Sequence, residues 1–195
     1  MVIGLTGGIG CGKSTAARLF EELGYRLLDS DKIVHELLAS DESVIKRIVE
    51  RFGSDMRLGE GGIDRKALGA IVFSDSEALE DLEAILHPET GKRWQTEVEA
   101  QASLNWVVEI PLLFEKNLQN RFDLTVCVFS DQRNQLERLS RKGLDRQQSL
   151  ARIAKQLPLK DKAEKADYTL LNDGTIDFLR VQIQTLVNEI NNNPL

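Results

Sequence analysis

The sequence predicts an α/β protein built on a five-stranded parallel sheet with helices on both faces. Short apolar runs alternate with amphipathic stretches along the whole chain, which is the pattern of a parallel sheet covered on both sides. The runs are continuously apolar, as strands buried on both faces are. A glycine-rich loop also joins the first run to the first amphipathic stretch. We expect strands at residues 2–6, 25–29, 106–110, 124–129 and 168–171.

Helical spacing marks the stretch after the first strand and the end of the chain. Apolar residues from Ala16 to Leu23 recur on one helix face, and Gly24 stands where that helix should end. The first two strands and this helix therefore form a compact βαβ unit. The last helix repeats the pattern with Ile176, Leu179, Ile183, Leu186 and Ile190.

The segment between the second and third strands is too long for a single crossover helix, so we expect an inserted helical subdomain at residues 32–104. Serine and glutamate with capping-box spacing, Ser74 and Glu77, predict a helix start there. His87 and Pro88 predict its end, because the residue before a proline avoids helical angles. The apolar positions of the expected helices are Ile33, Leu37 and Leu38; Val44, Ile45, Ile48 and Val49; Leu68, Ile71 and Val72; and Leu79, Leu82, Ile85 and Leu86.

Composition and charge restrict the class of protein. With 195 residues, 42% hydrophobic and 29% charged, the chain fits one folded domain with a small insertion. Its two cysteines, Cys11 and Cys127, cannot form a disulfide framework, and no basic leader or long apolar run is visible. We therefore expect a cytoplasmic protein without a membrane partner. The net charge of −6 argues against a general affinity for nucleic acid.

Residues 132–165 depart from this acidic balance, because ten Lys or Arg stand against four Asp or Glu. Such a segment, divided by Gly143, is typical of a mobile cover over a polyanionic ligand, although a solvated helix face has a similar composition.

The strongest motif is a phosphate-binding loop that matches G-x-x-x-x-G-K-S between a predicted strand and a predicted helix. Its glycines allow successive amides to surround a phosphate at a helix N-terminus. Lys13 should reach the β- and γ-phosphates of a nucleotide, and the Ser14 hydroxyl should coordinate Mg²⁺. A glycine-rich turn without a ligand is the alternative. The expected phosphate-binding residues are Gly7, Gly8, Ile9, Gly10, Cys11, Gly12, Lys13, Ser14 and Thr15.

Other residues separate the classes of protein that use such a loop. A guanine-nucleotide switch needs N-K-x-D and D-x-x-G strings, and neither occurs. A transporter-type ATPase needs an aspartate that closes an apolar strand, whereas the third strand carries only Glu109.

Asp29 and Asp31 close the second strand, and the carboxyl ends of parallel strands face the ligand crevice. Phosphoryl transfer to a hydroxyl needs a group that orients the hydroxyl and accepts its proton, and Asp31 is the candidate. The alternative is that Asp31 only caps a helix beginning at Lys32.

Several motifs together resemble those of the dephospho-CoA kinase family. The resemblance follows the chain in order through Leu5–Thr15 of the loop and Asp29-Ser30-Asp31, and continues nearly to its end. The later segments are Ile63-Asp64-Arg65, Leu86-His87-Pro88, Ile110-Pro111-Leu112-Leu113-Phe114-Glu115, Arg152-Ile153 with Gln156, Lys162, Ala166-Asp167 and Asn172-Asp173-Gly174.

The resemblance implies ATP-dependent phosphorylation of the ribose 3′-hydroxyl of dephospho-coenzyme A, which is the last step of coenzyme A synthesis. It implies a three-layer nucleotide-kinase core at residues 1–31, 105–131 and 166–195. Residues 32–104 would form the helical acceptor subdomain, and residues 132–165 the basic helical lid.

The resemblance also implies roles for individual residues, which are assigned from their positions in the matching motifs. Asp31 matches the proposed general base, Arg141 the lid arginine near the phosphates, and Asn172 to Gly174 the loop beside adenine. Arg65 and His87 match acceptor-side motifs, although His87 is equally well explained as a helix stop. Asp29 joins the acceptor site, and Leu113 either forms a wall for the pantetheine arm or closes the core.

Two positions depart from the family pattern. His35 stands where arginine is usual, and an uncharged imidazole offers less to a phosphate than a guanidinium does. Cys11 stands where serine is frequent, and near a helix N-terminus its thiol pKa would fall, which suggests sensitivity to oxidants; a tolerated small residue is the alternative.

Two rival functions stay open. A kinase for another small hydroxyl compound would share the loop and the paired aspartates, and a regulatory module would bind ATP or coenzyme A without turnover. The sequence leaves the oligomeric state open.

Overall fold

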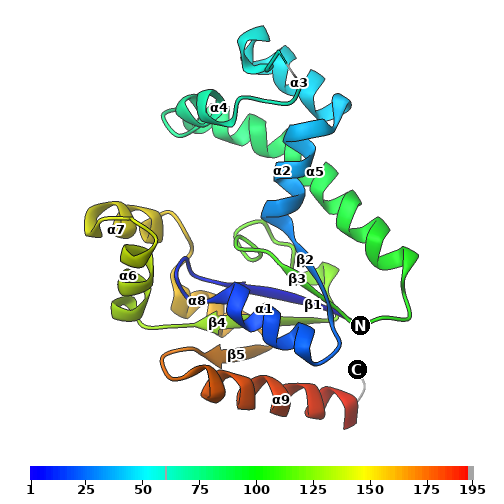
Figure 1. Cartoon of the computed structure of the whole chain (residues 1–195), viewed down its shortest axis with the longest axis vertical. Coiled ribbons are helices and arrows are strands. Elements are labelled where there is room, and N and C mark those ends of the chain that lie inside the picture. Colours follow the sequence, from blue (N-terminus) through cyan, green and yellow to red (C-terminus); the bar gives the residue numbers. More distant parts are fainter. Residues whose placement is uncertain (60, 193–195) are drawn as a thin grey trace. The chain divides into compact units, whose positions relative to one another are not determined.

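The computed structural model describes residues 1–59 and 61–192, and the chain divides into two compact units (Figure 1). The first unit comprises Met1–Leu28 and Ala102–Leu195, and the second comprises Asp29–Gln101.

A five-stranded parallel sheet forms the centre of the α/β fold, as the sequence predicted. The strand order is β2-β3-β1-β4-β5. β1 pairs in parallel with β3 through Val2 opposite Trp106 and with β4 through Ile3 opposite Leu124. β4 continues in parallel to β5, and this order places β1 between its two neighbours at the middle of the sheet. The strands are β1 (Val2–Gly7), β2 (Arg26–Asp29), β3 (Trp106–Glu109), β4 (Leu124–Phe129) and β5 (Tyr168–Leu171).

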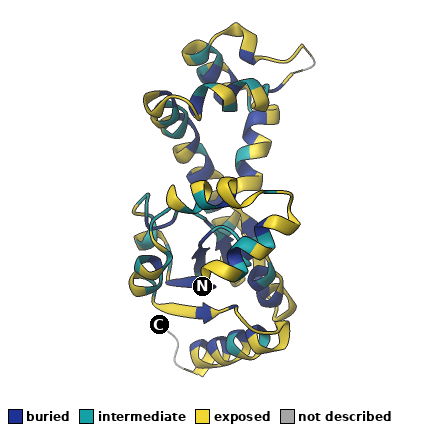
Figure 2. Ribbon diagram, turned by 90° about the vertical axis from the view of Figure 1, so that its left-hand side faces the viewer, coloured by how far each residue is buried: buried dark blue, intermediate teal, exposed yellow. Residues whose placement is uncertain are grey.

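Helices cover both faces of the sheet. α1 and α9 share one apolar core with Ile3, Leu5 and Val126, and Figure 1 shows α9 running beside β5. α8 packs against β1 and β4. The three central strands β1, β3 and β4 are mostly buried, whereas the edge strand β5 is largely exposed (Figure 2). The helices are α1 (Lys13–Glu22), α6 (Gln132–Arg141), α7 (Arg146–Ala154), α8 (Leu159–Lys165) and α9 (Ile176–Asn192), with a short 3₁₀ helix at Gln119–Arg121.

The second unit is helical, and an aspartate caps the start of each of its α-helices. Asp29, Asp41, Asp64 and Asp75 each accept hydrogen bonds from backbone amides of the following turn. The longest helix, α5, packs against the other three. The elements are α2 (Ser30–Ser40), α3 (Glu42–Phe52), a 3₁₀ helix at Ser54–Met56, α4 (Arg65–Val72) and α5 (Ser76–Ala100).

The sequence-based limits of α5 are wrong at both ends. Asp75, and not Ser74, caps the helix, accepting from the amides of Glu77 and Ala78 at 2.9 and 3.4 Å. The helix then continues through Pro88 to Ala100. Proline removes only one helical amide donor, and the turns beyond it are retained because they bury Thr90, Gly91 and Trp94.

Candidate functional site

The phosphate-binding loop lies between the end of β1 at Gly7 and the start of α1 at Lys13. Gly10 and Gly12 have φ angles of 79° and 89°, in the left-handed region that glycine adopts without strain. Gly12 is also the N-cap residue of α1, so the loop leads directly into the positive end of the helix dipole. The local chain thus needs glycine where the motif has it.

Donors from two distant parts of the chain, α6 and the segment after β5, bind the outer side of this loop. Each donates to a carbonyl group in the run of residues 9–11. Gln135 Nε2 donates to Ile9 O at 2.9 Å, Arg138 Nη1 to Gly10 O at 3.3 Å and Cys11 O at 3.2 Å, and Asn172 Nδ2 to Cys11 O at 2.7 Å. The loop conformation is therefore fixed by side chains more than 120 positions away.

The orientation of these carbonyls determines where the amides point. In a trans peptide the C=O and the next N–H point in opposite directions, and every peptide bond of the described chain is trans. With the carbonyls of Ile9 and Cys11 turned outward, the amides of Gly10 and Gly12 point to the opposite, concave side. Amides gathered above a helix N-terminus form a binding site for phosphate.

Lys13 and Ser14 lie where the motif predicts a lysine for phosphate and a hydroxyl for a metal. Lys13 Nζ is largely buried and donates to Gly7 O and Gly8 O, each at 3.3 Å. Ser14 Oγ is 3.5 Å from Glu109 Oε1 at the carboxyl end of β3. A hydroxyl and a carboxylate oxygen at this position suit Mg²⁺, which takes few protein ligands and completes its shell with water and substrate phosphates.

The sequence alone does not indicate a site role for Glu109, because a glutamate in the third strand does not match the expected aspartate. The order of the strands in the sheet is what indicates its role. β3 pairs with β1, so the ends of these two strands bring Glu109 to the start of the phosphate loop. Residues 1–59 and 61–192 contain no group of three or more His, Cys, Asp and Glu able to hold a metal ion.

Arg138, and not Arg141, is the arginine that contacts the loop. Both lie on α6, one helical turn apart. Arg138 Nη2 also donates to Asn172 O at 2.5 Å, so this side chain joins the phosphate loop to the segment after β5. Arg141 pairs with Glu137 at 2.5 Å, and its side chain is 74% exposed. Its role near the phosphates stays a prediction.

The two aspartates after β2 have different local roles. Asp29 Oδ1 accepts from the amides of Asp31 and Lys32 at 2.9 and 3.2 Å, so Asp29 is the cap of α2. The alternative that Asp31 caps this helix is therefore wrong. Asp31 is exposed and lies in the first turn of α2, two residues beyond the end of β2. The substrate contact predicted for Asp29 stays a prediction, with its carboxylate already engaged by two amides.

Arg65 binds the histidine that departs from the family pattern. Arg65 Nη2 is 2.8 Å from His35 Nε2. The pair joins α2 to the start of α4, and a second arginine at position 35 would repel Arg65.

Comparison with known proteins identifies the family. The family model described as Dephospho-CoA kinase matches residues 1–177. The chain belongs to the dephospho-CoA kinase family. The dephospho-CoA kinase of Carboxydothermus hydrogenoformans is 38% identical over 190 residues, which cover 95% of this chain and 92% of that protein.

Solved structures agree with this membership of the dephospho-CoA kinase family. The protein TT1252 from Thermus thermophilus has a TM-score of 0.83 and 34% identity, and the match covers 97% of each chain. Dephospho-CoA kinase from Campylobacter jejuni has a TM-score of 0.72 and 28% identity, covering 97% of this chain and 96% of that one. Among the residues that the structure describes, no helix combines the length and apolar character needed to cross a membrane.

Three further residues predicted from the dephospho-CoA kinase resemblance have distinct environments. Leu113 is completely buried and approaches Gly4 of β1, which favours the alternative that it closes the core. His87 lies exposed inside α5, so the alternative that it ends a helix is wrong. Gly174 follows Asn172 before α9, at a point where a Cβ atom would lie 3.1 Å from Phe178. The substrate roles of these residues stay predictions.

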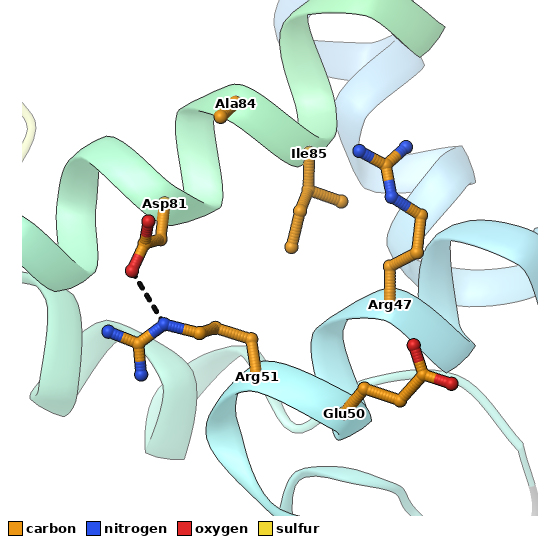
Figure 3. Close-up of a pocket in the computed structure, with 6 residues that line it drawn as sticks. All are labelled: Arg47, Glu50, Arg51, Asp81, Ala84 and Ile85. Atoms are coloured by element: carbon orange, nitrogen blue, oxygen red, sulfur yellow. Dashed lines mark hydrogen bonds and ion pairs between the residues drawn. The ribbon is translucent and has the colours of Figure 1, made fainter.

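A cavity of about 420 Å³ lies between α3 and α5 of the second unit (Figure 3). Arg51 reaches Asp81 at 2.5 Å, and Arg47 pairs with Glu89 at 3.4 Å. Both guanidinium groups are thus already neutralised by carboxylates. None of the residues predicted for the acceptor site lines this cavity, and we assign it no part in the reaction.

The structure contradicts the lowered thiol pKa on which the hypothesis of an oxidant-sensitive Cys11 rests, and it favours the alternative of a tolerated small residue. Burial raises the pKa of the Cys11 thiol and outweighs the charge of Lys13, which acts in the opposite direction. Burial also raises the pKa of Cys127 to about 12. Neither side chain has exposed surface, so the helix N-terminus does not produce a reactive thiolate here.

The buried thiols give a testable prediction. At pH 8 a maleimide should label neither cysteine in the folded protein, because thiolate formation and access are both suppressed. Mass spectrometry should find both cysteines labelled once guanidinium chloride unfolds the chain. Labelling of Cys11 in the folded protein at the rate of a free thiol would contradict this account.

Asp173 stabilises the connection between α6 and the segment after β5. Burial alone would raise its pKa, but hydrogen bonds from Ser130, the Asp131 amide and Asn134, together with the Arg138 charge, lower the pKa below its usual value. The ionised form therefore binds these donors in the folded protein, and it ties the residues around Arg138 to those around Asn172.

This lowered pKa predicts a pH-dependent effect of Asp173→Asn on stability. A carboxylate with a lowered folded pKa stabilises the fold fully above its unfolded pKa of about 3.9, and this stabilisation is lost as pH falls through the lower folded value. The Tm of the wild type should therefore exceed that of the variant at pH 7, and the difference should shrink below about pH 4. Thermal unfolding followed by circular dichroism tests this; a difference that does not vary with pH would exclude the effect.

Proposed function

We propose that this chain is an ATP-dependent kinase that transfers the γ-phosphoryl group of ATP to the ribose 3′-hydroxyl of dephospho-coenzyme A. The products are coenzyme A and ADP. The observation that carries the proposal is a phosphate loop with its carbonyls bound on the outer side, in a chain whose match to the dephospho-CoA kinase model extends over residues 1–177.

On the donor side, the loop binds the phosphates of ATP. The amides of Gly10 and Gly12 and the N-terminus of α1 stabilise the negative charge. Lys13 leaves the loop carbonyls that it now contacts and binds the β- and γ-phosphates as a point charge. Ser14 and Glu109 would hold Mg²⁺, which would neutralise charge on the phosphate oxygens.

On the acceptor side, Asp31 orients the ribose hydroxyl and accepts its proton. β2 belongs to the parallel sheet, and the carboxyl ends of parallel strands lie at the same end of the sheet. The phosphate loop follows the carboxyl end of β1, and the turn that leads to Asp31 follows the carboxyl end of β2. Residues 32–104 bind the rest of the acceptor, and the Arg65 guanidinium contributes to this. A carboxylate in this role contributes about 10²- to 10⁴-fold to the rate.

Residues 132–165 act as the lid. Their excess of positive charge attracts the triphosphate, and closure excludes the water that would otherwise hydrolyse ATP. Arg138 shapes the loop from outside, and Arg141 moves toward the phosphates on closure. We further infer that the protein works in the cytoplasm, since its two cysteines are free and buried.

An assay of ADP formation tests this function. Purified protein with ATP and Mg²⁺ should release ADP when dephospho-coenzyme A is added, and mass spectrometry should find a product heavier by one phosphate. Adenosine monophosphate, shikimate and pantetheine serve as competing acceptors. Faster turnover of one of these would favour a different small-molecule kinase, and ADP release that no acceptor stimulates would favour a regulatory module.

A further inference from the structure

Gln156 reaches the phosphate loop from the connection between α7 and α8. Its side-chain oxygen Oε1 accepts a hydrogen bond from the amide of Ile9 at 2.9 Å, across 147 positions of sequence. Its own amide donates to Ile153 O at 3.1 Å, so the last turn of α7 carries it toward the loop. Gln156 accepts a hydrogen bond from an amide of the loop, whereas Gln135, Arg138 and Asn172 donate hydrogen bonds to carbonyl groups of the loop.

Both polar groups of Ile9 are therefore bound by carboxamides. Gln156 Oε1 accepts a hydrogen bond from the Ile9 N–H, and Gln135 Nε2 donates to the Ile9 carbonyl at 2.9 Å. Two bonds on opposite sides fix the planes of the two peptide groups that flank Ile9, and the second of these planes carries the Gly10 amide. Because the Ile9 amide is bound to Gln156, the loop amides that face the phosphates begin with that of Gly10.

A buried ion pair fixes the backbone next to Gln156. The Leu157 amide donates to Glu115 Oε1 at 2.9 Å, and the same oxygen lies 2.7 Å from Lys162 Nζ. Lys162 has no exposed surface, and its ammonium group also donates to Pro111 O at 2.7 Å. A chain of close contacts thus runs from the segment after β3, through Glu115 and Leu157, to Gln156.

The unsatisfied second oxygen of the Glu115 carboxylate indicates that the ion pair positions the backbone rather than adding stability. Glu115 Oε2 is buried and has no hydrogen-bond partner among the described residues. Buried ion pairs contribute little net stability compared with well-packed apolar side chains, and their attested benefit is to specify one arrangement. Here the arrangement that the pair specifies is the path of the backbone at Leu157.

We propose that Gln156 is a positioning residue of the donor site, and that the buried Glu115–Lys162 pair holds it against Ile9. Gln156 sets the direction of the amides that bind the ATP phosphates and touches no reacting atom. The proposal deepens the proposed function and rests on it for the identity of the donor. Its tests read ATP binding and loop geometry, which do not depend on the acceptor.

The first test compares Gln156→Ala with Gln184→Ala, an exposed glutamine of α9, as the matched control. Calorimetry with the non-hydrolysable analogue AMP-PNP, without an acceptor, should find about tenfold weaker binding for Gln156→Ala, the loss expected for one hydrogen bond that orders a charged site. The KM for ATP should rise in parallel, and the KM for dephospho-coenzyme A should stay unchanged. Nucleotide affinity equal to that of the control would overturn the proposal.

A second readout follows the loop itself. In the ligand-free protein the Ile9 amide should exchange with deuterium at least about tenfold faster in Gln156→Ala than in the wild type, because its acceptor is lost. Tm should change by no more than a few degrees, since Gln156 is only partly buried. Unchanged exchange at Ile9 would also overturn the proposal. Loss of activity with dephospho-coenzyme A in the wild type would instead count against the proposed function alone.

The ion pair is tested by two double variants that remove both charges and so leave no buried ion unpaired. Glu115→Leu with Lys162→Met removes the acceptor of the Leu157 amide, and should weaken AMP-PNP binding about three- to tenfold. Glu115→Gln with Lys162→Met retains that acceptor, and should bind AMP-PNP nearly as the wild type does. Equal affinities of the two double variants would remove the pair from the proposal.

Coupling to Gln156 completes the test. Adding Gln156→Ala to the Glu115→Leu, Lys162→Met variant should weaken nucleotide binding no further than Gln156→Ala alone does, because residues that act through one contact are not additive. Fully additive losses would show that the pair and Gln156 act independently, which would overturn the link between them.

Discussion

Replacing Asp31 with asparagine should lower kcat at least about a hundredfold while leaving the affinity for ATP within about twofold. Asparagine keeps the size of the side chain and cannot accept a proton from the ribose hydroxyl. Helix α2 should be preserved, because its cap is Asp29 and not Asp31. Steady-state kinetics with dephospho-coenzyme A, together with calorimetry of AMP-PNP binding, measure the two effects separately.

Asp41→Asn provides the matched control for this variant. Asp41 caps α3 in the same unit, with Oδ1 accepting from the amides of Ser43 and Val44, each at 3.1 Å. Asparagine is as good a cap as aspartate, so this variant should keep both Tm and kcat. Turnover by Asp31→Asn close to that of Asp41→Asn would exclude Asp31 as the proton acceptor.

Replacing Lys13 with alanine should damage both binding and chemistry. The KM for ATP should rise about tenfold or more and kcat should fall about 10²- to 10³-fold, because the ammonium binds the phosphates in the ground state and the developing charge in the transition state. The same kinetic and calorimetric measurements test this. The fall in kcat distinguishes Lys13 from Gln156, which is expected to act on ATP affinity.

Lys46→Ala is the charge-matched control for Lys13→Ala. Lys46 lies on α3 with a 75% exposed side chain and pairs with Glu50 at 3.8 Å, an arrangement that contributes little in water. This variant should keep its KM for ATP and its kcat within about twofold. If Lys13→Ala retained a kcat similar to that of Lys46→Ala, the lysine would have no role in the transition state.

Much of the fold could be predicted from the sequence because parallel strands buried on both faces appear as apolar runs. The predicted strand at 124–129 agrees with β4, and the predictions at 25–29 and 106–110 each differ from the structure by one residue. The course of α5 through Pro88 could not be predicted, because packing around Trp94 outweighs the local preference of a proline.

The position of the phosphate loop could be predicted because local sequence determines its geometry. The glycines of the phosphate loop require their φ angles locally, and the motif therefore located the loop and the start of α1. The side chains that bind its outer side come from α6 and from the segment after β5, and no spacing in the sequence indicates such long-range contacts. The choice of Arg141 over Arg138 illustrates this, since only the fold decides which turn of a basic helix faces the loop.

A crystal structure with AMP-PNP, Mg²⁺ and dephospho-coenzyme A would test the central claim most directly, namely that the loop binds the donor triphosphate while Asp31 orients the acceptor hydroxyl. We predict an Asp31 carboxylate oxygen about 2.6–3.2 Å from the ribose 3′-oxygen, with that oxygen in line with the γ-phosphorus above Lys13. A complex in which Asp31 faces solvent and another group contacts the 3′-oxygen would contradict the account.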